Sequence, residues 1–306
     1  MAAMPPSGRQ YVINHGAQRA VVTEVGGGLR AYAVDGQEVI DGYAEDEMCS
    51  AARGAPLLPW PNRLQDGRYE FAGVTYQTPL SEPDRRNAIH GLTRWLSWTA
   101  RVNEADRVVM ELLLHPQDGY PFRLSLAIEY RLSQRGLAVQ ATATNAGLQA
   151  LPYGAGHHPY LTVGTELIDE ARLRIPALMY LEVDERQIPT GRAIPVQGTA
   201  VDFLELRRIG PMKLDTAFAS LLSDADGLTR VQLQAPSGRP SLTLWMDKTY
   251  RFVMAFTGDA IPQLDRRRRS VSLEPMTCAP NAFRSGDGLI VLQPGESARG
   301  TWGILL

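Results

Sequence analysis

Cysteine is scarce in this sequence: the chain of 306 residues has two, Cys49 and Cys278. They lie far apart and show none of the close spacing that is typical of cysteine ligands in a metal site. Two cysteines are also too few for the disulfide framework of a small secreted protein. The scarcity favours a reducing compartment, and we expect a cytoplasmic protein.

Long apolar runs and a strong net charge are also missing. No stretch approaches the ~20 apolar residues of a membrane span, and the first ten residues, MAAMPPSGRQ, lack the pattern of a secretory signal. The formal net charge of −2 gives no overall positive field that would attract nucleic acid or an anionic membrane. We expect a small polar molecule as partner, no nucleic acid and no membrane, and a monomer or homodimer.

Helical patterns are absent as well. No window of a dozen residues has apolar side chains at helical spacing, and 21 prolines and 28 glycines interrupt the chain. In 122–132, apolar and polar residues alternate, and a turn at 133–136 leads into a second alternating run. The sequence predicts a mainly β protein with antiparallel strands. We expect 1–8 to be a flexible N-terminal tail and 9–306 to form a single domain.

Two of the five histidines, His157 and His158, stand together in the segment LPYGAGHHPYL at 151–161. Pro159 fixes its own φ and disfavours helical backbone at the residue before it, so this segment should be extended and stiff. Histidine has the unperturbed pKa closest to neutral pH, which suits it to proton transfer. A structural interpretation is also open, in which one of the pair is exposed and the other hydrogen-bonded at a strand end.

A second stiff segment, PLLPWPNR at 56–63, ends in Asn62 and Arg63. Its three prolines leave little backbone entropy to lose, so these two side chains can be held in a nearly fixed pose. Arg63 can donate paired hydrogen bonds to sugar hydroxyls or an anion, or it can tie down the loop. In NAIHG at 87–91, His90 precedes a glycine and has room to reach a ligand.

Near the C-terminus, VSLEPM at 271–276 puts Glu274 directly before a proline. We expect its carboxylate to close an apolar strand at the point where the strand gives way to a loop. A half-buried carboxylate in that position can have a raised pKa and act as a base, or it can pair with an arginine. Four consecutive arginines at 266–269 indicate a solvated loop, with anion binding as the alternative.

Five motifs together resemble the aldose 1-epimerases, the galactose mutarotase family, and in particular a bacterial branch with HPY and EPM motifs. The motifs are PWPNR at 59–63, NAIHG at 87–91, GHHPY at 156–160, DTAF at 215–218 and LEPMT at 273–277. The resemblance covers about 19–302 and implies a large antiparallel β-supersandwich. The HHPYL at 157–161 departs from the NHSYF setting of the galactose mutarotases, which bears on the preferred sugar.

The resemblance also implies roles for individual residues. Glu274 matches the general base, His158 the general acid, and His90 a second histidine that assists through hydrogen bonds. The expected substrate-binding residues are Arg63, Asp215, Asn62 and Tyr160.

The implied reaction interconverts the α and β anomers of a free aldohexose without a metal or other cofactor. Opening the ring takes a proton from the anomeric hydroxyl and gives one to the ring oxygen, which one base and one acid on opposite sides of the ring can do. We expect Trp60, Trp95 or Tyr160 against the apolar side of the sugar, with at least one of them in the core.

Three other interpretations stay open. The substrate can be an anionic sugar, a hexose 6-phosphate or a sulfonated sugar, bound by Arg85, Arg86 or the 266–269 run. His90, His158 and Glu274 can instead form a metal site of two histidines and a carboxylate. The chain can also be a non-catalytic carbohydrate-binding protein on the same fold.

Overall fold

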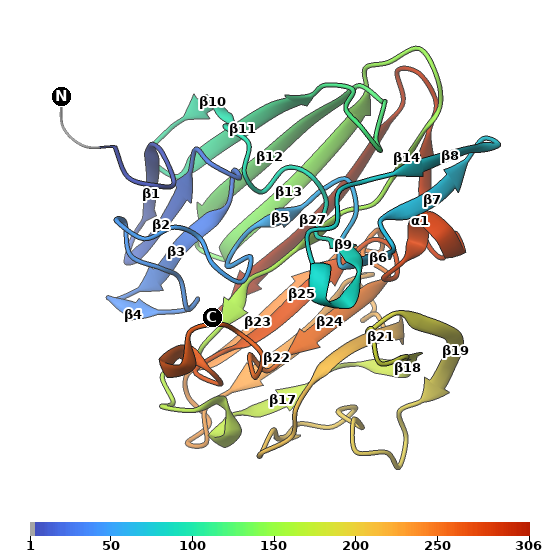
Figure 1. The fold of residues 1–306 in the computed structure, drawn as a ribbon. Helices are drawn as coiled ribbons and strands as arrows, with labels where there is room; N and C mark the ends of the chain where they lie inside the picture. The colour runs from blue at the N-terminus through green and yellow to red at the C-terminus, as the bar shows by residue number, and fades with distance from the viewer. Residues whose placement is uncertain (1–3) are drawn as a thin grey trace.

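The computed structural model describes residues 4–306, and its regular secondary structure is mainly antiparallel β-sheet (Figure 1). Two large sheets have nine and eight strands, and four smaller sheets have two to four. The helices of this part are short: α1 (Ala282–Ser285) and the 3₁₀ helices η1 (Pro83–Arg85), η2 (Ile168–Glu170) and η3 (Leu264–Arg266). The prediction of a mainly β fold is confirmed. No helix among residues 4–306 has the length and apolar character needed to cross a membrane.

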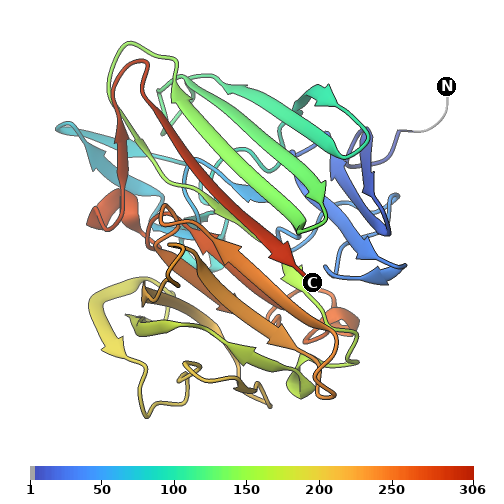
Figure 2. The same cartoon turned by 180° about the vertical axis from the view of Figure 1, so that it is seen from behind.

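The nine-stranded sheet has the strand order β10-β11-β12-β13-β27-β23-β22-β17-β20. Figure 2 shows its strands from behind, with the green, red and orange strands lying side by side. Its strands are β10 (Thr99–Asn103), β11 (Arg107–Leu114), β12 (Leu124–Ser133), β13 (Gly136–Asn145), β17 (Arg172–Arg174), β20 (Arg207–Arg208), β22 (Thr229–Gln234), β23 (Ser241–Met246) and β27 (Ser297–Leu305).

The eight-stranded sheet has the order β19-β18-β21-β24-β25-β15-β5, with β16 also paired to β25. Its strands are β5 (Pro56–Leu57), β15 (Gly156–His157), β16 (Tyr160–Leu161), β18 (Ala177–Val183), β19 (Pro189–Pro195), β21 (Asp215–Leu221), β24 (Phe252–Phe256) and β25 (Val271–Met276).

Four smaller sheets complete the fold. Their strands are β1 (Gln10–His15), β2 (Gln18–Thr23), β3 (Leu29–Val34) and β4 (Gln37–Glu38) in one sheet, then the pairs β14 (Leu151–Tyr153) with β26 (Ile290–Leu292), β6 (Arg63–Gln65) with β9 (Asn87–Ile89), and β7 (Arg68–Phe71) with β8 (Val74–Gln77).

The hairpin of β12 and β13 shows why the alternating pattern forms a sheet. Buried residues occupy every second position of both strands, because successive side chains of a strand point to opposite faces. The two strands pair from Leu124 opposite Asn145 to Ser133 opposite Gly136, so the turn predicted at 133–136 is confirmed.

One hydrophobic core lies between the two large sheets. Leu126 and Ile128 of β12 belong to the same buried cluster as Val253 and Ala255 of β24 and Leu273 of β25. Successive side chains of β24 and β25 point to opposite faces, so the residues between these core positions lie on the other face of the eight-stranded sheet. That outer face carries the candidate site.

The described part of the N-terminal segment packs against the body of the protein. Residues 1–3 of the expected tail lie outside the described residues. Ser7 is buried, and its carbonyl accepts a hydrogen bond of 3.0 Å from the backbone N–H of Val25.

Candidate active site

Three neighbouring strands align polar side chains on the outer face of the eight-stranded sheet. Asp215 of β21 pairs with Phe256 of β24, which in turn pairs with Ser272 of β25. Glu274 lies two residues further along β25, opposite Met254, and therefore on the same face as Ser272. The register thus brings residues from three distant segments to one place.

Glu274 lies inside β25, so the expectation that it closes the strand is wrong. Pro275 is tolerated there because its missing N–H falls at a break in the neighbouring strand. The N–H groups of Leu273 and Thr277 donate to carbonyls of the segment 155–159, so odd-numbered positions of β25 point their N–H groups toward that edge. β15 ends and β16 begins within this segment, and no ladder bond is required at the proline.

His158 occupies the break between β15 and β16. Its Nε2 lies 3.2 Å from Oε1 of Glu274, and its Nδ1 lies 2.8 Å from Oγ of Ser272. The Ser272 hydroxyl also donates to Oε1 of Glu274 at 3.4 Å, which closes a three-residue network. The imidazole stacks on the ring of Tyr160, at 4.9 Å between centroids, and the guanidinium of Arg53 lies 4.6 Å from that ring's centroid. These contacts fix the orientation of the imidazole.

The two adjacent histidines have different surroundings. His157 packs against Trp302 and Tyr250, with ring centroids at 5.2 and 6.2 Å. Both histidines are buried, at 1% exposure for His157 and 4% for His158, so the interpretation with one exposed histidine is wrong. Burial lowers the pKa of His157 from 6.5 to about 3, so it is neutral in the folded protein at neutral pH.

We expect His157 to weaken the fold in acid. The unfolded chain binds a proton at His157 below about pH 6.5, whereas the folded protein binds it only near pH 3. The free energy of unfolding therefore falls as the pH drops through this range. Between about pH 6.5 and 4.5 the loss is on the order of 2 kcal/mol. His157→Leu should reduce the dependence of the unfolding free energy on pH by this amount, measured by urea titrations across this range. The contributions of His158 and His90, whose pKa values are also lowered by burial, should remain.

The control for that measurement is His115→Leu, because His115 is an exposed histidine. An equal pH dependence in the two variants would contradict the role given to His157.

Two loop residues near His158 have left-handed backbone conformations. Asn62 has φ of 54° and His90 has φ of 65°, and the N–H of His90 donates to the carbonyl of Asn62 at 2.9 Å. Non-glycine residues in this region are strained and are concentrated at functional sites. The ring of His90 meets that of His158 edge to face, with 5.2 Å between centroids.

Arg63 is held by two carboxylates. Its guanidinium donates to both oxygens of Glu82 at 3.0–3.2 Å, and its Nη2 lies 3.5 Å from Asp215. Burial opposes its charge, but the Asp215 and Glu82 carboxylates hold the pKa of Arg63 above its ordinary value. Both interpretations of Arg63 therefore have contacts to support them: it anchors the loop that carries Glu82, and it lines the cavity.

All seven residues that the sequence predicted for the site line one cavity of about 460 Å³. They are Asn62, Arg63, His90, His158, Tyr160, Asp215 and Glu274. The volume is in the range of pockets that hold small molecules.

The buried pair of Glu274 and His158 favours a state with a single shared proton. Burial, reinforced by the charge of Asp215, raises the pKa of Glu274 well above its usual value. Burial, with the charges of Arg94 and Arg53, lowers the pKa of His158 to about 3. The contact of 3.2 Å is then a hydrogen bond between neutral partners, and moving its proton from Oε1 to Nε2 gives carboxylate and imidazolium without changing the proton count.

Two atoms of the site have no hydrogen-bond partner among residues 4–306. Oε2 of Glu274 and Nδ1 of His90 are both buried, and both residues line the cavity. Unpaired buried polar atoms cost free energy, so these two atoms are suited to bind groups of a ligand.

Several residues that line the cavity are not among the site residues predicted from the sequence. Arg94, Glu82 and Phe256 line the cavity, together with Ile261 and Pro262. None of them stands in a stiff or repeated motif, so no local pattern distinguishes them from ordinary surface or strand residues. The strand register and the loop packing bring them to the site.

The expected aromatic contacts are only partly present. Tyr160 lines the cavity, whereas Trp60 is buried in the core against Phe283, with 5.3 Å between ring centroids. Trp95 is 54% exposed and is not among the lining residues. Phe256 is the additional aromatic residue of the site.

The arginine run 266–269 does not line the cavity. Arg267 and Arg269 are exposed, as expected for a solvated loop. Arg268 pairs with Asp169 at 2.8 Å and with Asp259 at 2.9 Å, so this member of the run ties loops together.

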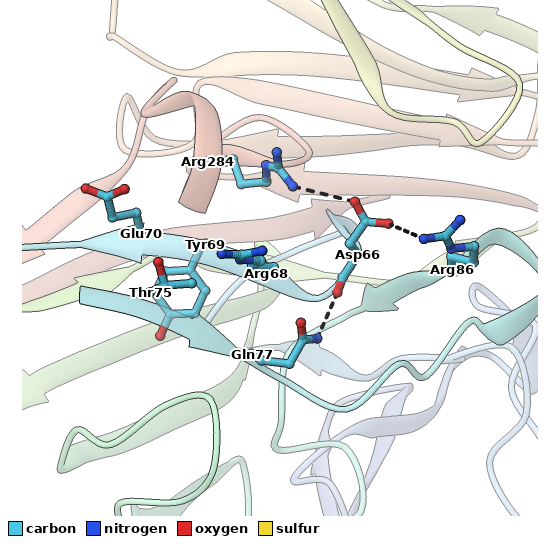
Figure 3. A pocket seen from close by; sticks show the side chains of 8 residues that line it. All are labelled: Asp66, Arg68, Tyr69, Glu70, Thr75, Gln77, Arg86 and Arg284. Atoms are coloured by element: carbon cyan, nitrogen blue, oxygen red, sulfur yellow. Dashed lines mark hydrogen bonds and ion pairs between the residues drawn. The ribbon is translucent and has the colours of Figure 1, made fainter. Parts of the chain in front are cut away.

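A second cavity of about 550 Å³ lies beside the β7–β8 hairpin (Figure 3). Arg86 and Arg284 converge there on the carboxylate of Asp66, at 3.8 and 3.7 Å. This cavity is larger than the one that holds Glu274, but it shares none of the predicted site residues and has no histidine in its lining. We therefore place the chemistry in the smaller cavity.

The metal interpretation has no geometric support. Within the part of the chain that the structure describes, no three His, Cys, Asp or Glu side chains are arranged to hold a metal ion. The direct contact of His158 with Glu274 uses the atoms that such a site would need.

Comparison with known proteins gives the following relations. The family model described as aldose 1-epimerase matches residues 9–304. An uncharacterized Escherichia coli K12 protein, YihR, is 33% identical over 294 residues, covering 96% of this chain and 92% of that protein. Human galactose mutarotase is 30% identical over 182 residues, which cover 56% of this chain and 52% of that protein. A solved structure of a GalM/aldose epimerase homologue from C. elegans has a TM-score of 0.85 and 17% sequence identity, and the match covers 97% of this chain and 98% of that one. At this identity the similarity supports the fold alone.

Proposed function

The chain belongs to the aldose 1-epimerase family, and from this premise we propose that it interconverts the α and β anomers of an aldohexose by opening and closing the sugar ring. Family membership confirms the resemblance that the five motifs indicated. The sugar, the mechanism and the roles of the residues are our proposal. The observation that carries it is the contact between Glu274 and His158 inside a sugar-sized cavity.

In the proposed reaction, Glu274 accepts the proton of the anomeric hydroxyl while His158 donates a proton to the ring oxygen. The pair reaches the required carboxylate and imidazolium when its shared proton moves to Nε2. After rotation of the aldehyde, ring closure returns both protons, and the pair is unchanged. Acid and base groups positioned in this way typically contribute ~10² to 10⁴ in rate, and the steps require no cofactor.

The contact distance changes one feature of the expected mechanism. The mechanism expected from the sequence has base and acid on opposite sides of the ring, but Oε1 and Nε2 are 3.2 Å apart. The anomeric hydroxyl oxygen and the ring oxygen are bonded to the same carbon, so two groups in contact can address both from one side. The free Oε2 of Glu274 is the atom we assign to the anomeric hydroxyl.

The remaining lining residues would bind the sugar. His90 has its unpaired Nδ1 for a hydroxyl, and its pKa is lowered by burial and by the charges around it, so it acts as a neutral imidazole. Arg63, Asn62 and Asp215 can hydrogen-bond other hydroxyls, and Tyr160 would limit the space beside His158. We further propose a cytoplasmic location, which rests on the two free cysteines.

The proposed function is tested with a panel of aldoses. Exchange between anomeric proton signals, followed by NMR at equilibrium, measures interconversion directly. We expect the protein to accelerate exchange for at least one sugar beyond the rate in buffer, and E274Q to remove the acceleration. If it accelerates exchange for no aldose of the panel, the proposed function is wrong.

A further inference from the structure

Arg53 is a buried cation whose surroundings leave most of its guanidinium without hydrogen bonds. The residue is 2% exposed, and its Nη2 lies 3.2 Å from the carboxylate of Asp41. Within residues 4–306, its Nε and Nη1 have no hydrogen-bond partner. Burying these N–H groups without acceptors costs free energy. A charge that the fold keeps at such a cost is a candidate for a functional role.

An aromatic ring connects this charge to the proposed acid. The guanidinium carbon of Arg53 lies 4.6 Å from the centroid of the Tyr160 ring. The imidazole of His158 stacks on the same ring, with 4.9 Å between centroids and an interplanar angle of 22°. The guanidinium and the imidazole are therefore within about 10 Å of each other, and all three residues are buried. At this separation a charge in a buried region is felt without screening by water.

The backbone keeps this arrangement in place. The segment 51–55, which carries Arg53, is hydrogen-bonded to His158 in both directions. One N–H of the segment donates to the carbonyl of His158 at 2.9 Å, and the N–H of His158 donates to a carbonyl of the segment at 3.0 Å. The Tyr160 hydroxyl donates to another carbonyl of the segment at 3.2 Å. The distance between the charge and the imidazole is thus set by the fold.

Arg53 stands apart from the other charges near the catalytic pair. The titratable and charged groups around Glu274 and His158 are His90, Tyr160, Arg53 and Arg94 on the histidine side, and Asp215 and Arg63 on the carboxylate side. Arg94 and Arg63 line the cavity, where a substrate can contact them. Arg53 and its partner Asp41 do not line it. Any effect of Arg53 on the reaction would therefore act through His158.

We propose that Arg53 is a positioning residue whose fixed charge keeps the pair of Glu274 and His158 in its single-proton state. A guanidinium stays charged at every pH at which the protein works, and a nearby positive charge disfavours the uptake of a second proton. A pair with two protons has no base, because Glu274 is then a neutral carboxylic acid beside an imidazolium. The effect on rate rests on the proposed function, whereas the effect on protonation does not.

The first test is the pH profile of kcat/KM for anomer exchange. Arg53→Met removes the positive charge, so each protonation step of the pair becomes easier and its pKa rises. Both limbs of the profile should move to higher pH, by roughly half a unit to one unit. KM should change little, because Arg53 does not line the cavity. R53K keeps the charge and should return the profile toward that of the unmodified protein.

The matched control is R230M, which makes the same change at an arginine paired with Asp224 and Asp226 on the protein surface. It should leave the profile unchanged. Thermal unfolding verifies that each variant is folded. If Arg53 had only a structural role, R53M and R53K would both lower the rate without moving the profile, and that result would overturn the inference.

Asp41→Asn tests the same charge by the opposite change, and it decides the question if R53M does not fold. Asparagine keeps an oxygen that can accept the hydrogen bond of 2.7 Å from the Ser270 hydroxyl, but it no longer compensates the charge of Arg53. The profile should therefore move to lower pH. A folded D41N with an unmoved profile, or one moved to higher pH, would contradict the inference.

A final measurement separates this inference from the proposed function. The ¹⁵N NMR signals of the His158 imidazole report the protonation of the pair without any sugar. R53M should raise its apparent pKa by the same half unit to one unit, and R230M should not. If the protein turns over no aldose, the proposed function fails, yet this titration still decides the role of Arg53. Equal titrations of R53M and the unmodified protein would overturn that role.

Discussion

Replacing Glu274 by glutamine is expected to lower kcat/KM for anomer exchange by at least ~10²-fold. The amide keeps the size of the side chain, but it cannot take the proton of the anomeric hydroxyl. The carboxylate is 2% exposed, so its environment raises its pKa and makes it a stronger base than a solvated glutamate. Exchange NMR on the preferred sugar gives the rates of both proteins.

The control is Glu70→Gln in the other cavity, which makes the same chemical change away from His158 (Figure 3). It should leave the rate within a small factor of the unmodified protein. An E274Q protein that is folded and as active as this control would remove Glu274 from the mechanism.

His158→Asn is expected to have an effect of similar size, at least ~10²-fold, because the ring oxygen then has no imidazolium to protonate it. The asparagine amide can still place a polar atom near the position of Nδ1, so it can replace the hydrogen bond between His158 and Ser272. The measurement is again kcat/KM by anomer exchange, with thermal unfolding to confirm that the variant is folded.

The double variant gives the sharper result. Glu274 and His158 share one proton across a contact of 3.2 Å, so they should act as a unit. Replacing both should therefore lower kcat/KM little more than replacing either one alone. His115→Asn, at an exposed histidine, is the matched control. If the two single losses multiply in the double variant, the shared-proton mechanism is contradicted.

Much of the candidate site could be predicted because its residues stand in locally stiff segments. Asn62 and Arg63 follow three prolines, His158 precedes one, and Glu274 precedes another. Proline restricts the backbone around these residues whatever the rest of the chain does, so the local sequence is informative about their pose.

The error about Glu274 has a physical cause. Glu274 was expected at a strand end because a proline usually interrupts a ladder, but the break between β15 and β16 makes Pro275 acceptable inside β25. For Glu274 the outcome depends on a neighbouring segment that is distant in sequence. Trp95 is one of three aromatic candidates for contact with the sugar, and it is exposed outside the cavity.

The amino-acid sequence by itself determined the β class, the hairpins and the family, because period-two patterning, turn residues and ordered motifs are local properties of the chain. Only the tertiary structure decided which polar groups meet. The register of β21, β24 and β25 puts Asp215, Ser272 and Glu274 on one face, and the loop after β9 brings Arg94 to the same cavity. Such pairings arise from contacts across the sheets, where burial sets the charge states, and no single stretch of sequence encodes them.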